Sequence, residues 1–66
     1  MNANTEIKFS FLSRTSAWAF MREVDAERAG QAGFPSLEGP YLVRVIPAHP
    51  AQVVRIAQEH GGVEIS

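Results

Sequence analysis

The chain has 66 residues, with six basic and seven acidic side chains that leave a net charge of −1. These charges are interspersed and form no basic stripe, which argues against a nucleic-acid partner, and no apolar run approaches the roughly 20 residues that cross a bilayer, which argues against a membrane. There is no cysteine, which excludes disulfides and thiolate metal ligands. We therefore predict one small globular domain over residues 1–66, with residues 1–5 flexible and with a cytoplasmic location.

Residues 6–12 alternate apolar and polar side chains, which is the period of a half-buried strand. Its two faces carry, in turn, Ile7, Phe9 and Phe11, and then Lys8, Ser10 and Leu12. A short polar turn follows over residues 13–16, and its hydroxyl side chains are common helix caps. A strand is therefore predicted to lead into a helix through this turn.

The first helix has a buried stripe at helical spacing, formed by Ala17, Phe20, Met21 and Val24. Its end is predicted near Gly30 or Gly33, because glycine suits the left-handed position after a helix. Trp18 lies at the flank of the stripe. It either half-covers the core or, as a residue type common in interface hot spots, lines a partner surface.

Two strands are expected between the helices. Residues 41–46 are rich in β-branched side chains and apolar except for Arg44, which is typical of a central strand. Residues 34–38 are ambiguous, because Pro35 lacks a backbone donor and is tolerated only at the edge of a sheet. Glu38, Gly39 and Pro40 predict a turn between the two segments.

A second helix is predicted from Pro50, a residue favoured in the first helical turn, to the pair Gly61 and Gly62. Its buried face is formed by Val53, Val54, Ile56 and Ala57. Residues 63–65 then form a last short strand.

This order of elements predicts an α+β fold, a ferredoxin-like β-α-β-β-α-β sandwich whose antiparallel sheet carries both helices on one face. The edge-type proline and the central-type strand fall where that fold needs them. If residues 34–38 are not a strand, the alternative is β-α-β-α-β with a parallel three-stranded sheet.

The polar turn before the first helix is a candidate ligand-binding site for a phosphate or carboxylate. A helix start attracts anions, and the first acidic residue after the turn is Glu23, two turns on. The candidate ligand-binding residues are Ser13, Arg14, Thr15, Ser16 and His60. In the parallel topology His49 would replace His60, and the competing interpretation is an ordinary helix cap. No metal or cofactor is predicted, because the two histidines lie at opposite ends of one helix.

The side of the sheet away from the helices is a candidate interaction surface. If Tyr41, Val43 and Val45 face the helices, this side holds the predicted interface residues Leu12, Leu42, Arg44 and Ile46, with Lys8 at the rim. RNA-binding sheets place aromatic side chains on such a face, whereas the aromatic residues of the first strand would face the helices here. We therefore predict self-association, as a homodimer, or a protein partner.

These observations favour a non-catalytic binding, regulatory or oligomerisation module of unknown partner. The alternative is a small anion-binding protein or a small enzyme with its site at the polar turn. The sequence has no phosphate-binding loop, dinucleotide fingerprint or zinc-protease motif that would assign an activity.

Overall fold

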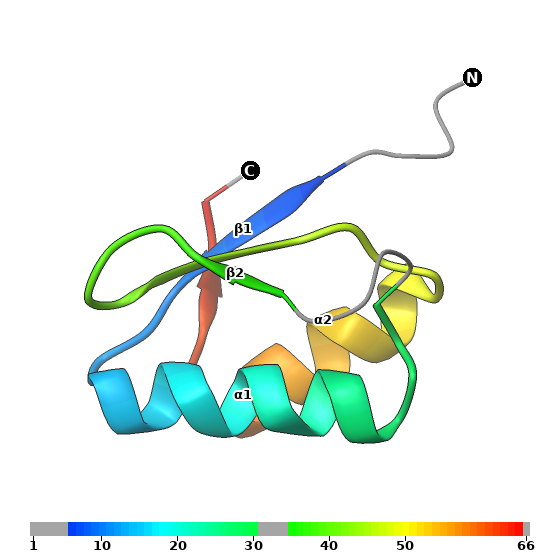
Figure 1. Cartoon of the computed structure of the whole chain (residues 1–66), viewed down its shortest axis with the longest axis horizontal. Helices are drawn as coiled ribbons and strands as arrows, with labels where there is room; N and C mark the ends of the chain where they lie inside the picture. Colours follow the sequence, from blue (N-terminus) through cyan, green and yellow to red (C-terminus); the bar gives the residue numbers. More distant parts are fainter. Residues whose placement is uncertain (1–5, 31–34, 66) are drawn as a thin grey trace.

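The computed structural model describes residues 6–30 and 35–65. Over these residues the chain forms two helices and a four-stranded sheet. In chain order the elements are β1 (Ile7–Ser10), α1 (Arg14–Ala26), β2 (Ser36–Leu37), β3 (Leu42–Val45), α2 (Pro50–Glu59) and β4 (Val63–Glu64). Both helices lie on the same side of the sheet, so the domain has two layers (Figure 1).

The strands follow the order β2-β3-β1-β4, and each neighbouring pair is antiparallel. β1 pairs with β3 from Ile7 opposite Val45 to Ser10 opposite Leu42. The expected pairing of the first strand with residues 41–46 is therefore confirmed. The parallel three-stranded alternative is wrong, because residues 36 and 37 form an edge strand and β1 runs antiparallel to β3.

The core lies between the sheet and the helices. Its buried members are Phe9, Phe11, Ala17, Phe20, Met21, Val24, Ala29, Val43, Val45, Val53, Ile56 and Ala57. Three phenylalanine rings meet at its centre, with ring centroids 5.3 Å apart for Phe9 and Phe20 and 5.0 Å apart for Phe11 and Phe20. Each large apolar side chain buried here stabilises the fold by about 1.5–3 kcal/mol.

The predicted helix-facing residues of the sheet are buried in the structure, with two exceptions at the ends of strands. Ile7 is only partly buried, and half of the Tyr41 side chain is exposed. Tyr41 lies beyond the end of β3, where its carbonyl accepts a hydrogen bond from the Phe11 amide at 2.8 Å. Because Tyr41 lies opposite the buried Phe11, it is on the helix side of the sheet, but half of its side chain stays exposed to solvent.

The predicted end of the first helix is also wrong. α1 stops at Ala26, four residues before Gly30, and Gly33 lies outside the described residues. The chain turns back at Arg28, which adopts a left-handed φ of 55°. The amides of Arg28 and Ala29 then bond the carbonyls of Asp25 and Val24 at 3.1 and 3.0 Å. This paired closure is a Schellman motif, and it uses arginine in the place that usually holds glycine.

The second helix ends where expected, by the same closure. Gly61 has a φ of +77°, and the amides of Gly61 and Gly62 bond the carbonyls of Gln58 and Ala57 at 3.1 and 2.7 Å. Gly62 also passes close to the core, because a Cβ there would lie 2.6 Å from an edge carbon of the Phe11 ring. The chain therefore enters β4 through a position that has no room for a side chain.

Candidate functional site

The face of the sheet away from the helices carries a row of three side chains from three strands, with a serine between two apolar residues. Ser10 of β1 lies opposite Leu42 on one side and opposite Val63 of β4 on the other. Directly paired residues of antiparallel strands share a face, so these three side chains lie on the side opposite the buried Phe9 and Val43. We call this side the open face.

The open face exposes more apolar surface than solvation needs. Val63 is 64% exposed and Ile65 48%, while Leu42 and Ile46 are half-buried; Leu12, which is 89% exposed, lies in the bend beyond the end of β1. Ile65 continues the pairing of β4, because its amide donates to the Lys8 carbonyl at 2.9 Å, and alternation along the strand puts it on the same face as Val63. Val63 and Ile65 were not among the predicted interface residues, although their spacing of two was visible in the sequence.

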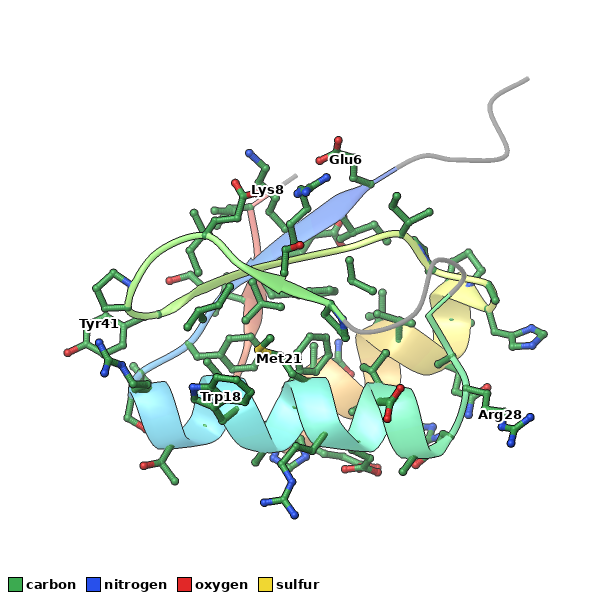
Figure 2. All side chains as sticks on the ribbon, viewed as in Figure 1. Glu6, Lys8, Trp18, Met21, Arg28 and Tyr41 are labelled. Carbon is green, nitrogen blue, oxygen red and sulfur yellow. The ribbon has the colours of Figure 1, made fainter. Side chains whose placement is uncertain are left out.

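Four charged side chains occupy the rest of the open face. The Arg44 Nε donates to Glu38 Oε2 at 2.8 Å, and its Nη1 lies 3.5 Å from Glu6 Oε2. Lys8 Nζ lies 3.8 Å from the other oxygen of Glu38. Figure 2 shows Glu6 and Lys8 projecting from the side of the sheet away from the helices. Each of these solvent-exposed pairs contributes only about 0–1 kcal/mol, so their main effect is to leave the face neutral.

The polar turn before α1 has the geometry of a helix cap. The Ser13 hydroxyl oxygen accepts a hydrogen bond from the Ser16 amide at 3.1 Å, and the Ser13 hydroxyl donates to the Ser16 hydroxyl at the same distance. Arg14 and Thr15 are exposed, and Arg14 has no ion pair within the described part of the chain. The four residues are adjacent in space, and anion binding by them stays a prediction.

His60, the fifth predicted ligand-binding residue, is held by α1 at a different place. Its Nε2 lies 2.7 Å from Glu23 Oε1, and Glu23 is nine residues past Arg14, about 13 Å along the helix. The imidazole is therefore bound well away from the polar turn. His49, the residue of the rival topology, is the exposed N-cap of α2.

A second polar contact joins the two helices beside this pair. Gln52 Nε2 donates to Glu27 Oε1 at 2.6 Å, and Arg55 Nη2 lies 3.4 Å from the same oxygen. The hydrogen bond from Gln52 holds the pKa of Glu27 below its ordinary value, and Glu23 and Arg55 act in the same direction. Arg55 also bonds Glu59 one turn on, at 2.8 Å. These contacts clamp the helix layer and leave the open face untouched.

Trp18 lies on α1 and is 43% exposed, so its position at the flank of the stripe fits both interpretations of it. In Figure 2 it sits at the helix layer, on the opposite side of the sheet from Lys8. It is therefore not part of the open face.

Within residues 6–30 and 35–65, no group of three or more histidine, aspartate or glutamate side chains is placed to hold a metal ion. Neither described helix is long and apolar enough to span a membrane. Comparison with protein-family models, with curated proteins and with solved structures finds no match to this chain. The open face is thus the feature on which a functional argument can be built.

Proposed function

We propose that this protein is a non-catalytic interaction module of ferredoxin-like topology, which binds a protein partner through its open face. The observation that carries the proposal is the exposure of Val63 and Ile65 in the same sheet face as half-buried Leu42. A sheet with one solvated face normally alternates apolar side chains inward and polar ones outward. Here β3 carries apolar side chains on both faces, and Val63 of β4 adds another apolar side chain to the open face.

The ferredoxin-like assignment is supported by two observations. The chain order is β-α-β-β-α-β. The two strands joined by each helix are not neighbours in the sheet: β3 lies between β1 and β2, and β1 lies between β3 and β4. Among residues 6–30 and 35–65, no element covers the outer face of the sheet (Figure 1). A cytoplasmic location stays a prediction from the sequence.

Exposed apolar patches on a small protein mark contact surfaces when polar residues surround them. The open face fits this description, because Lys8, Arg44, Glu38 and Glu6 border its apolar residues. Such a face would bind or regulate another protein by the packing of its apolar side chains.

The proposal is tested by site-specific photo-crosslinking in cells that express the chain. A photoreactive amino acid is placed at Val63 on the open face and, as the matched control, at Ala51, an exposed position of α2. We expect protein adducts from position 63 and none from position 51. Equal yields of adducts from both positions, or none from either, would contradict the proposal that the open face binds a protein.

A further inference from the structure

We infer that the occupant of the open face is a second copy of this chain, packed sheet against sheet around a two-fold axis. This inference rests on the proposed function, because it names the partner of the same surface. Three properties of the face support it: its charge, its apolar content and its size.

The charges of the open face balance within the face itself. Lys8 and Arg44 contribute two positive charges, and Glu6 and Glu38 contribute two negative charges. A two-fold interface brings the same patch together with itself, so a patch of one sign would repel its copy. A neutral patch that holds both signs avoids this repulsion, and its carboxylates can pair with cations of the second copy. A partner selected by charge would instead require a patch of one sign.

The apolar side chains are arranged so that a second sheet can cover them. Leu42 and Val63 stand on either side of Ser10, the small residue at the centre of their row. Two packed sheets lie about 10 Å apart, with interdigitated side chains between them. The space above Ser10 can therefore receive an apolar side chain from the opposing sheet, while Ile65 extends the contact along β4.

The size of the face matches a weak, reversible dimer. The layers are stacked across the intermediate axis of the molecule (Figure 1), so the long and short extents of 32 and 17 Å bound the area of the face. This gives on the order of 500 Å² per copy, close to the lower end of specific interfaces, which bury about 1,000 Å² or more in total. Because area alone does not determine affinity, association is measured from tens to several hundred micromolar.

The experiment combines sedimentation equilibrium with isotope-filtered NMR on a mixture of labelled and unlabelled chain. We expect a monomer–dimer equilibrium, with contacts between copies from the methyl groups of Leu42 and Val63. Val63→Glu should weaken the dimer by at least about tenfold in Kd. Ala51→Glu, on the exposed side of α2, should leave it unchanged. Because position 63 is largely exposed, the variant keeps its fold, which far-ultraviolet circular dichroism verifies.

Two results would contradict the inference that a second copy of the chain covers the open face. One is a monomer at several hundred micromolar, and the other is a dimer whose contacts come from the helices or from the outer edge of β4. The proposed function fails separately, through the crosslinking experiment. If position 63 crosslinks to a different protein while the pure chain stays monomeric, the interaction module survives and the second copy does not.

Discussion

The two helices end by the same hydrogen-bond closure, but the residues that make it differ at each position. At the left-handed position α1 has Arg28 and α2 has Gly61. At the next position α1 buries the methyl group of Ala29, whereas α2 has Gly62. The backbone hydrogen bonds therefore determine the closure. The surroundings of each helix end determine which side chains fit there: none at Gly62, an exposed one at Arg28 and a buried methyl group at Ala29.

The two helix ends are alike in another respect. The C-cap of α1 is Glu27, and its side chain reaches α2 through Gln52. The C-cap of α2 is His60, and its side chain reaches α1 through Glu23. The residue that ends each helix thus makes a side-chain contact with the other helix.

The largest loss of stability is expected at Gly62, where the end of α2 has no space for the side chain that the end of α1 holds. Gly62→Ala would place a Cβ 2.6 and 2.8 Å from two carbons of the buried Phe11 ring and 3.1 Å from the Ala57 carbonyl oxygen. The ring is held among other core rings and cannot move away, so we expect a loss of about 2–3 kcal/mol in the free energy of unfolding. Urea denaturation measures this loss. Gly39→Ala is the control, because its nearest neighbour would be an ordinary 3.9 Å away, and an equal loss there would contradict the steric explanation.

A smaller loss is expected at the left-handed position of α2. Gly61→Ala meets no atom within 4 Å, but an alanine there must adopt a φ of +77°. This backbone strain costs about 1 kcal/mol, measured in the same denaturation series. If Gly61→Ala proves as costly as Gly62→Ala, crowding rather than backbone conformation limits this helix end.

Placing a glycine at the left-handed position of α1, which is now Arg28, should stabilise the protein. Arg28 is exposed and already holds a φ of 55°, and Figure 2 shows it at the far end of α1, outside the core. Arg28→Gly relieves the strain and is expected to add about 0.5 kcal/mol, after the entropy that glycine gains in the unfolded chain is subtracted. Arg28→Ala separates the effect of backbone strain from that of the side-chain charge. It removes the charge but keeps the strain, so it should leave the stability nearly unchanged. A gain from alanine equal to that from glycine would assign the effect to the lost charge.

The contact that Glu27 makes at the end of α1 should depend on pH. The pKa of Glu27 is lowered in the folded chain from an ordinary value near 4.5, so its carboxylate stabilises the fold fully above that value. This stabilisation is lost as the pH falls from about 4.5 through the lowered folded pKa. Denaturation midpoints of Glu27→Gln against the parent chain from pH 7 down to pH 3 should converge as the pH falls. A constant difference across this range would show that the hydrogen bond does not depend on the charge.

The smallest effect is expected at the starts of the helices, which offer an internal control. Both helices lack an acidic residue in their first turn, but α1 has a hydroxyl cap beside Arg14, whereas α2 begins at His49 with no side-chain cap. If the polar turn binds phosphate or a small carboxylate, amide shifts in a titration should saturate at residues 13–17 and stay flat at residues 49–52. Equal shifts at both starts, or shifts that vanish with modest salt, would reduce the turn to a helix cap.

The element order and most of the core could be predicted, because period-two and period-3.6 patterns determine which side chains turn inward. The end of α1 could not be predicted, because the prediction relied on the preference of Gly30 for a helix end. The actual end depends on the burial of Ala29, which the local sequence does not show. The spacing of Val63 and Ile65 indicated a shared face, but which face this is depends on the pairing of Val63 with Ser10, which the sequence does not give. The contact of His60 with Glu23 depends on how two helices pack, which local sequence does not encode.

The brevity of β4 has a consequence for any partner of the open face. Only two of its residues pair with β1, yet Val63 and the adjoining Ile65 supply the most exposed apolar side chains of the sheet itself. A short, exposed edge strand opens at a small fraction of the free energy of global unfolding. The binding-competent surface exists only while β4 is docked, so the apparent affinity equals the intrinsic affinity multiplied by the docked fraction. Amide exchange at Ile65, whose hydrogen bond to Lys8 reports that docking, should therefore slow when a partner binds.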